Sequence, residues 1–287
     1  MLIADGFKDF EVVDASCGEK AERWGKYTTV RPDPQVIWNT PKTSDVWRDP
    51  DAVYSRSNTG GGKWVVNKLP ESFVINYKDL KFRIKPMNFK HTGLFPEQAV
   101  NWDRCSELIR NSGRDIRVLN MFAYTGAASV AASKAGAQVC HVDASKGMTQ
   151  WAKENAELNG ISNIRFIVDD CVKFVEKEFR RGKKYDAIIM DPPSYGRGPS
   201  GEIWKLETEI YGLLQKTVSI MSDEPLFFLL NSYTTGLSAG CMGYMLGYVM
   251  KERYGDKGKV TFDEIGLPVK NSGFVLPCGS SAFFTVE

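Results

Sequence analysis

The stretch Arg117–Ser129 reads RVLNMFAYTGAAS, and it decides how the second part of the chain folds. Its first six residues, Arg117–Phe122, form a mostly apolar run typical of a buried strand. A single glycine, Gly126, then precedes small residues that suit the start of a helix. Such a tight turn lets backbone amides approach a ligand, although Gly126 could equally serve the turn alone. This turn holds neither GxGxxG nor GxxxxGK[ST], which disfavours a nucleotide-phosphate site here.

Strand and helix patterns alternate from about residue 114 onward. In the clearest helical pattern, 145–159, apolar residues recur on one face, Ser145 can cap the start and Gly160 the end. Alternating strands and helices predict a parallel sheet covered on both faces. A loop with Pro268, Gly273 and Pro277 joins the last two strands, which suits an antiparallel pair at one edge. The predicted strands are 117–122, 138–142, 164–168, 185–190, 226–231, 259–265 and 281–286.

Residues 1–90 follow a different sequence pattern, with short strand-like runs between turns that contain proline and glycine. They predict a small β-rich N-terminal domain, followed by a second domain over residues 91–287. The first domain is a candidate for RNA or substrate recognition, because aromatic and basic residues can stack on bases and neutralise single-stranded RNA. Most of these aromatics equally suit the core of a small β domain. The residues concerned are Trp24, Lys26, Tyr27, Arg31, Trp38, Trp47 and Arg48.

Charge and cysteine usage narrow the functional classes. The 287 residues carry a net charge of +2, from 37 basic and 35 acidic side chains, which is not the footprint of a general nucleic-acid binder. Six cysteines without CxxC spacing and only two histidines favour neither a zinc site nor a disulfide framework. No apolar run is long enough for a membrane span, and the acidic first residues do not read as a signal peptide. We therefore expect a cytoplasmic protein without a metal site.

Acidic residues follow the second and third predicted strands, where ligands of open α/β sheets bind. Asp143 lies about 20 residues beyond the first strand's end, which is the place of an acceptor for ribose hydroxyls. It could also cap the next helix, for which Ser145 competes. Asp169 and Asp170 could accept a hydrogen bond from an exocyclic amine, or could cap the helix that follows them.

The fourth predicted strand ends in MDPPSYGRG, residues 190–198. Two prolines cannot continue a central strand, because neither donates to the ladder. Asp191 and the carbonyl of Pro192 would form a rigid set of acceptors beside an aromatic side chain, Tyr195. Such a set suits an amine or a planar base, although a proline-stiffened loop would look the same.

Taken in order, the segments RVLNMFAYTGAAS, VDAS, VDDCV and MDPPSYGRG resemble the class I S-adenosylmethionine-dependent methyltransferases. Together with FKHTGLFPEQAVNW (residues 89–102), they are most similar to the bacterial large-subunit (23S) rRNA methyltransferase I/K-like branch. The resemblance covers about residues 73–287. It implies a Rossmann-like α/β fold with a seven-stranded sheet and an antiparallel last strand, S-adenosyl-L-methionine as methyl donor, and rRNA or another RNA as substrate.

The resemblance also implies roles for individual residues. Asp191, Pro192, Pro193 and Tyr195 would face the acceptor as the catalytic set. Asp143 would hold the ribose hydroxyls, Asp170 the adenine amine, and Gln98 would approach the donor's carboxylate. The implied donor-binding residues are Gln98, Phe122, Ala123, Tyr124, Thr125, Gly126, Asp143, Ala144, Ser145, Asp170 and Cys171.

Two departures from that branch matter. Carbon methylation of cytosine uses a cysteine nucleophile, and neither DPPSYG nor the fifth strand's end, NSYTTG, holds one. Cys241 follows later, on a predicted helix, and is a weak substitute. Methylation of a base nitrogen is therefore favoured. The N-terminal segment does not resemble the RNA-binding domain of some relatives, so a small-molecule or protein acceptor stays open, as does a non-catalytic donor-binding or RNA-binding protein.

Overall fold

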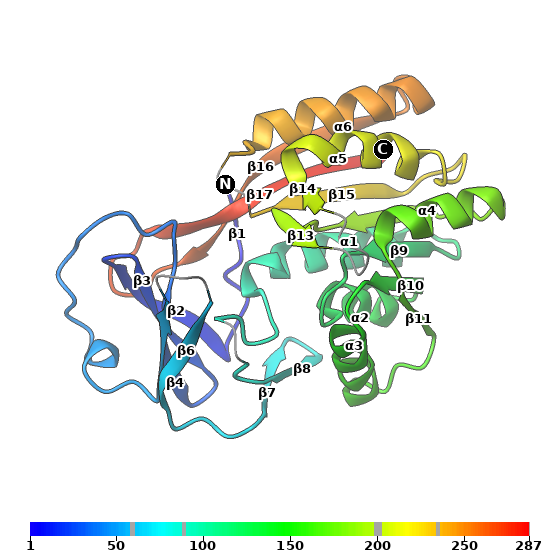
Figure 1. Ribbon diagram of the computed structural model, residues 1–287. Helices are drawn as coiled ribbons and strands as arrows, with labels where there is room; N and C mark the ends of the chain where they lie inside the picture. Colours follow the sequence, from blue (N-terminus) through cyan, green and yellow to red (C-terminus); the bar gives the residue numbers. More distant parts are fainter. Residues whose placement is uncertain (58–60, 88–89, 198–202, 234–235, 287) are drawn as a thin grey trace. The chain divides into compact units, whose positions relative to one another are not determined.

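The chain folds into two compact units in the computed structural model shown in Figure 1, which describes residues 1–57, 61–87, 90–197, 203–233 and 236–286. The first unit comprises Met1–Val100 and Ile265–Cys278, and the second comprises Asn101–Glu264 and Gly279–Glu287. We predicted a boundary after residue 90. The units divide the chain at Val100 instead, and a segment from near the end of the chain belongs to the first unit.

The largest sheet has eight strands in the described part of the chain, in the order β1-β16-β17-β15-β12-β9-β10-β11, and its central strands β15, β12, β9, β10 and β11 belong to the second unit. The central strands pair in parallel, whereas β17 runs antiparallel to β15. The predicted Rossmann-like fold with an antiparallel last strand is thus confirmed. The strands are β1 (Leu2–Ile3), β9 (Arg117–Met121), β10 (Gln138–Asp143), β11 (Ile164–Val168), β12 (Ala187–Met190), β15 (Phe227–Ser232), β16 (Gly258–Pro268) and β17 (Val275–Val286).

One strand more than the predicted seven joins this sheet. The short β1 pairs in parallel with β16, Leu2 opposite Ile265 and Ile3 opposite Gly266. Two residues are too few to show an alternating pattern, so this strand was not predictable from the sequence. The last two strands are also longer than predicted, and Pro277 lies inside β17 rather than in the connecting loop.

Helices cover both faces of the sheet. A continuous apolar core joins α4, α5 and α6 to one face, and Figure 1 shows α1, α2 and α3 on the other. The strands β12 and β15 are buried along their whole length, as expected for parallel strands covered on both sides. The helices are α1 (Ala99–Asn111), α2 (Ala127–Lys134), α3 (Lys146–Leu158), α4 (Cys171–Arg180), α5 (Leu206–Val218) and α6 (Ala239–Tyr254).

The first unit is β-rich, as predicted. Its main sheet has the order β2-β3-β4-β5-β6, and β7 and β8 form a separate hairpin. Among the described residues, no helix is long and apolar enough to cross a membrane. The remaining elements are β2 (Phe10–Ser16), β3 (Glu19–Trp24), β4 (Tyr27–Pro32), η1 (Asp45–Trp47), β5 (Ala52–Arg56), β6 (Gly62–Asn67), β7 (Phe73–Tyr77), β8 (Leu80–Ile84), η2 (Pro96–Gln98), β13 (Tyr195–Arg197) and β14 (Ile203–Lys205), the last two forming a hairpin in the second unit.

Two residues that we considered for RNA stacking belong to the core of the first unit. Trp24 is fully buried against Phe10, with ring centroids 4.5 Å apart. Arg31 is buried too, and its guanidinium donates to the carboxylate of Glu22 at 2.7 and 2.8 Å. Neither side chain can reach an RNA base, so the stacking interpretation is wrong for both.

Candidate functional site

The carboxyl ends of four neighbouring strands meet at one edge of the large sheet. Met121 is paired with Val142 on one side and with Met190 on the other, and Asp143 is paired with Val168. The residues that follow these strands therefore share one edge. This is the edge at which open α/β sheets bind ligands.

The turn after β9 has an unusual backbone. Phe122 and Tyr124 have positive φ values of 53° and 51°, and Gly126 has 81°. Left-handed backbone is costly for bulky non-glycine residues and is concentrated at functional sites. Hydrogen bonds fix the turn, since the amide of Ala123 donates to Val142 at 3.1 Å and the amide of Gly126 to Ala123 at 2.9 Å.

Gly126 has a packing role as well as a conformational one. A Cβ atom at this position would lie 2.8 Å from the Cβ of Ala152 on α3. The residue is the N-cap of α2 and has no side chain with which to cap it. The preceding residue, Thr125, is buried, and its carbonyl accepts the side-chain amide of Asn155 at 2.9 Å. Thr125 thus has a structural role in holding the turn against α3.

Asp143 joins the turn after β9 to the start of α3. Its Oδ2 accepts the amide of Tyr124 and its Oδ1 accepts the amide of Ser145, both at 2.8 Å. Burial raises the pKa of this carboxyl, and the two amides oppose that effect. A carboxylate has about four acceptor sites, so it can accept two further donors such as the hydroxyls of a ribose. The cap of α3 is Ser145, as predicted, whose Oγ accepts the amide of Met148 at 3.3 Å.

The residues after β11 serve the start of α4. Oδ1 of Asp170 accepts the amide of Lys173 at 2.9 Å, which is the helix-capping alternative that we left open. Asp169 binds the ammonium of Lys177 at 2.6 Å. Cys171 is buried, and the amide of Phe122 points at its sulfur from 3.3 Å. Burial raises the pKa of the Cys171 thiol, which disfavours the thiolate form that reacts as a nucleophile.

Asp191 directly follows β12, and the loop after it is held by a residue that we did not predict. The indole of Trp204, on β14, donates to the carbonyl of Pro193 at 2.6 Å. The same indole lies 5.5 Å from the ring of Phe122 and so connects this loop to the turn after β9. Tyr195 is 49% exposed on the paired strand β13. A single tryptophan 11 residues after the proline carries no sequence signal of this contact.

The remaining predicted residues differ in their surroundings. Ala144 and Ser145 are exposed between β10 and α3, and Pro192 is buried whereas Pro193 is exposed. Gln98 is half-buried at the end of η2 and belongs to the first unit, unlike the other candidates.

Next to the turn after β9 lies a row of buried, hydrogen-bonded polar side chains that we did not predict from the sequence. The amide of Asn120 donates to Ser129 Oγ at 2.9 Å, and that hydroxyl lies 3.0 Å from Nδ1 of His141. The tautomer of His141 decides which of these two atoms donates, and Nε2 of the ring has no hydrogen-bond partner in the described residues. Burial lowers the pKa of His141 to about 3, so the imidazole is neutral and structural.

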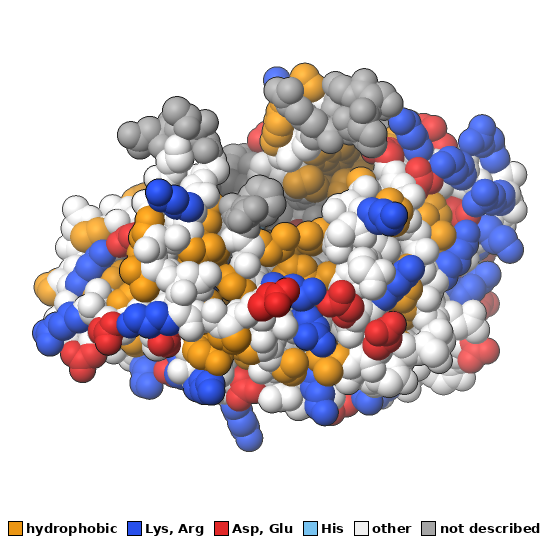
Figure 2. All heavy atoms as spheres, turned by 60° about the horizontal axis from the view of Figure 1, so that its bottom comes forward, with side chains coloured by type: hydrophobic (Ala, Val, Ile, Leu, Met, Phe, Trp, Pro, Cys, Tyr) orange, Lys and Arg blue, Asp and Glu red, His pale blue; other side chains and the backbone are white. Residues whose placement is uncertain are grey.

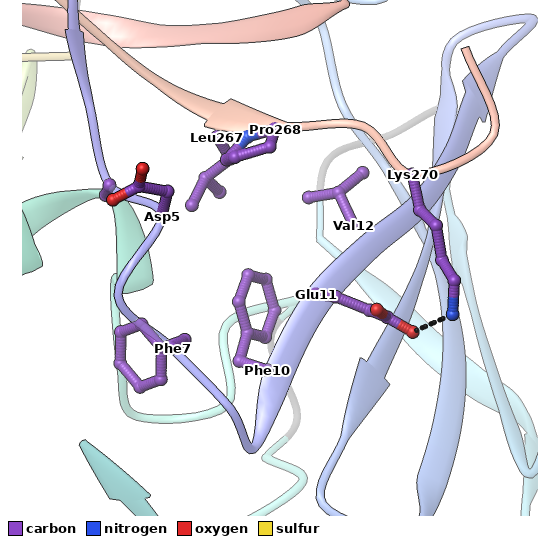
Figure 3. Close-up of a pocket in the computed structure, with 9 residues that line it drawn as sticks. Asp5, Phe7, Phe10, Glu11, Val12, Leu267, Pro268 and Lys270 are labelled. Carbon is purple, nitrogen blue, oxygen red and sulfur yellow. Dashed lines mark hydrogen bonds and ion pairs between the residues drawn. The ribbon is translucent and has the colours of Figure 1, made fainter. Parts of the chain in front are cut away.

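The first unit contains a small cavity of about 170 Å³, shown in Figure 3. The rings of Phe7 and Phe10 and the side chain of Leu267 line it, and the ion pair between Glu11 and Lys270, at 3.1 Å, closes one side. Small-molecule pockets typically measure roughly 300–1,000 Å³. The cavity is therefore too small for a nucleotide-sized cofactor.

The strand-end residues fit the predicted S-adenosyl-L-methionine in their chemistry. Asp143 has acceptor capacity for a diol, the turn at 122–126 with its left-handed backbone lies beside it, and α2 begins there without a side-chain cap. Phe122 and Tyr124 are half-buried and supply apolar surface. In the described part of the chain, no group of three or more His, Cys, Asp or Glu residues could hold a metal ion.

Comparisons with known proteins identify the family and the fold of this chain. The model of the S-adenosylmethionine-dependent methyltransferase family matches residues 53–208. The crystal structure of a SAM-dependent methyltransferase from Agrobacterium tumefaciens superposes with a TM-score of 0.93 at 34% identity, covering 100% of this chain and 93% of that one. A protein from Streptococcus mutans described as a SAM-dependent methyltransferase shares the fold, with a TM-score of 0.72 at 19% identity over 98% of this chain and 76% of that one.

Curated relatives match over a shorter range. The ribosomal RNA large subunit methyltransferase K/L of Pseudoalteromonas translucida is 35% identical over 131 residues, which are 45% of this chain and 18% of the relative. The ribosomal RNA large subunit methyltransferase I of Aeromonas salmonicida is 37% identical over 128 residues, 44% of this chain and 31% of the relative. The chain thus spans less than a third of the length of each of these two relatives.

Proposed function

Because this chain belongs to the S-adenosylmethionine-dependent methyltransferase family, we propose that it methylates a nitrogen of a base in RNA, with rRNA as the first acceptor to test. The observation that carries this proposal is the loop that starts at Asp191. It follows the strand next to β9, and it presents the half-exposed ring of Tyr195. Relatives that match the chain are named as rRNA large-subunit methyltransferases.

The donor would be held by the edge formed by β9, β10 and β11. Asp143 would accept the ribose hydroxyls, and Phe122, Ala123, Tyr124 and Gly126 would surround the rest of the donor, with Asp170 and Cys171 near its base. When bound, S-adenosyl-L-methionine supplies a methyl group on a sulfonium, which is already activated for displacement. The chain's own residues then need only bring the acceptor into line and exclude competing orientations.

The acceptor base would lie against the Asp191 loop. Tyr195 would stack on it, a contact of about 1–3 kcal/mol. The carboxylate of Asp191 and the carbonyl of Pro192 would accept N–H donors of the base and so direct a nitrogen lone pair toward the methyl group. The carbonyl of Pro193 already accepts the Trp204 indole, so it would serve the loop and not the base. A base in structured RNA would have to leave its stack to reach this loop.

Nitrogen is preferred to carbon because of where the cysteines lie. All six are in described residues, and those exposed are Cys17, in the first unit, and Cys241, on α6. Cys171 lies at the strand-end edge but is buried, and burial raises the pKa of its thiol. A thiolate nucleophile beside the Asp191 loop would be needed for attack on a ring carbon.

We further propose that residues 1–90 serve RNA or substrate recognition and that the protein acts in the cytoplasm. The six cysteines are free, which suits a reducing compartment. With Trp24 and Arg31 buried, recognition would fall to side chains on the surface of the first unit, such as Lys26 and Tyr27.

The test is methyl transfer from tritiated S-adenosyl-L-methionine to separate pools of rRNA, tRNA, protein and small metabolites. The proposal predicts label in RNA, at a base nitrogen identified by mass spectrometry of nucleosides. Asp191→Ala should abolish transfer while binding of S-adenosylhomocysteine is retained. Label only in the protein or metabolite pool would overturn the RNA assignment, and label on a base carbon would overturn the nitrogen assignment.

A further inference from the structure

We infer that Arg165 and Arg181, held side by side by the buried carboxylate of Glu178, form a contact surface for the phosphate backbone of RNA at the carboxyl end of α4. This inference rests on the proposed RNA substrate and adds to it a second contact away from the strand-end edge. All its residues belong to the second unit.

Glu178 is the organising residue of this surface. Its side chain is 1% exposed, and Nη1 of Arg181 lies 2.9 Å from its Oε1. Nη1 of Arg165, on the edge strand β11, lies 3.8 Å from its Oε2. The hydroxyl of Tyr185 donates to Oε2 at 2.7 Å. A buried carboxylate is tolerated only with such partners, so Glu178 holds the guanidinium of Arg181 by a hydrogen bond and attracts that of Arg165 as an ion pair.

Both arginines have N–H donors that the contact with Glu178 does not use. Their side chains are 52% and 55% exposed, although each contacts Glu178. A guanidinium has five N–H donors in a planar fork, and the contact with Glu178 leaves several of them directed at solvent. Two guanidiniums that share one carboxylate leave a net positive charge, and such forks match the geometry of phosphate oxygens.

Further positive charge surrounds this pair. The segment 173–184 has six basic and two acidic residues, whereas the whole chain has a net charge of only +2. Arg180 and Lys183 are exposed and form no ion pair within the described residues. Figure 2 shows Lys and Arg side chains gathered at the right-hand margin, on the side where Figure 1 draws the end of α4. Cations are expected at a helix carboxyl end. Of the six basic residues, Lys177 is paired with Asp169 and Lys184 donates to the carbonyl of Ser219, so Arg180, Arg181 and Lys183 are the exposed cations beside Glu178.

An exposed aromatic side chain lies within the same segment. Phe179 is 59% exposed and precedes Arg180 and Arg181 directly. Single exposed apolar residues are common on proteins. An aromatic ring among cations is, however, the composition with which proteins bind single-stranded RNA, the ring stacking on a base and the cations neutralising phosphates.

The position of the surface sets the length of RNA that it requires. Asp170 caps the first turn of α4 at the strand-end edge, and the helix runs for ten residues to Arg180, or about 15 Å at 1.5 Å per residue. We therefore expect that a free nucleoside bound at the Asp191 loop does not contact this surface. An RNA of many nucleotides can occupy both places.

The experiment compares charge-neutralised variants of the full chain by fluorescence anisotropy with a labelled rRNA fragment at several salt concentrations. In Arg180→Gln/Lys183→Gln, neither side chain takes part in the Glu178 cluster, so the fold is not at risk. Arg165→Gln/Arg181→Gln removes the two guanidinium groups that contact Glu178. The matched control is Lys251→Gln/Lys257→Gln, which removes two exposed charges near the end of α6 in the same unit.

We expect either surface variant to bind RNA about 3- to 30-fold more weakly than the control. The slope of log K against log salt should also become shallower by about 1.4, from two lost contacts at roughly 0.7 each. Binding of S-adenosylhomocysteine should be unchanged. If a folded Arg165→Gln/Arg181→Gln binds RNA as the control does, the inference is wrong. Where that variant fails to fold, control-like binding by Arg180→Gln/Lys183→Gln overturns the inference. If the wild-type protein methylates no RNA, the proposed function itself has failed.

Discussion

The backbone amide of Tyr124 donates to the carboxylate of Asp143 at 2.8 Å, across the ends of two neighbouring strands. Asp143 thereby shapes the turn that would surround the methyl donor, in addition to any direct contact with the donor. Asp143→Asn should weaken binding of S-adenosylhomocysteine by about 10- to 100-fold, since hydrogen bonds to a charged group contribute about 1.5–3 kcal/mol. Isothermal titration calorimetry measures this directly. Asp115→Asn, at an exposed carboxylate before β9, is the control, and equal affinities for the two variants would contradict the role of Asp143.

Gly126→Ala should be more destabilising than alanine at another left-handed glycine. At Gly126 the new Cβ would lie 2.8 Å from the Cβ of Ala152, whereas Gly160, with a φ of 67°, has nothing within 4 Å. Left-handed backbone costs alanine about 1–2 kcal/mol, and crowding adds about 1–3 kcal/mol. Urea unfolding should therefore show a larger loss for Gly126→Ala than for Gly160→Ala. In a double-mutant cycle, Ala152→Gly should recover part of that loss, and strict additivity would rule out the packing explanation.

The strand ends were predictable because the strands leading to them are apolar runs. The strand 164–168 was predicted with the bounds of β11, and the ends of the other central strands were placed within one residue. Burial on both faces imposes such runs. The end of the chain was less readable, because Pro268 and Pro277 suggested a loop where long strands continue.

The contacts between side chains were much harder to predict. Asp170 was assigned to an adenine amine, and capping of α4 is the contact that its carboxylate makes within the chain. Trp204 reaches Pro193 only because β13 and β14 pair as a hairpin. In the sequence, Glu178 is one of the acidic residues of a helix that also carries basic residues. Its contacts with Arg165 and Tyr185 arise only from tertiary packing. Such relationships follow from tertiary packing, which a local pattern does not encode.

Trp204→Phe tests whether the Asp191 loop must be held in place. Phenylalanine keeps an aromatic ring near Phe122 but cannot donate to the carbonyl of Pro193. Loss of one hydrogen bond, about 0.5–1.5 kcal/mol, should lower kcat for methyl transfer by roughly 2- to 10-fold and leave the affinity for S-adenosylhomocysteine unchanged. Steady-state kinetics with tritiated donor provide the measurement. The control is Tyr211→Phe, on α5, which should have wild-type kinetics. If Trp204→Phe had the same kcat as this control, the hydrogen bond from Trp204 to Pro193 would not be needed for methyl transfer.

The double variant Cys17→Ala/Cys241→Ala should retain methyl transfer. These are the exposed cysteines, and so the thiols that a covalent mechanism could recruit most easily. Nitrogen methylation needs no thiolate, so turnover should stay within about twofold of wild type, measured with the RNA pool that accepts label. A loss of several orders of magnitude, with normal binding of S-adenosylhomocysteine, would instead indicate a cysteine nucleophile.

His141 should make the protein less stable as the pH falls below neutrality. Burial lowers its pKa in the folded state to about 3, whereas the unfolded chain takes up a proton near pH 6.5. Between these values the unfolded state binds more protons, so the free energy of unfolding decreases as the pH falls from about 6.5 toward 3. Burial and nearby cations also lower the pKa of His91 to about 3, so this residue contributes to the same loss of stability. Urea unfolding at several pH values should give a shallower slope for His141→Asn than for wild type, whatever the absolute stability of the variant. Replacement of both histidines should flatten the slope further, and a slope in His141→Asn equal to that of wild type would mean that the buried imidazole is already charged.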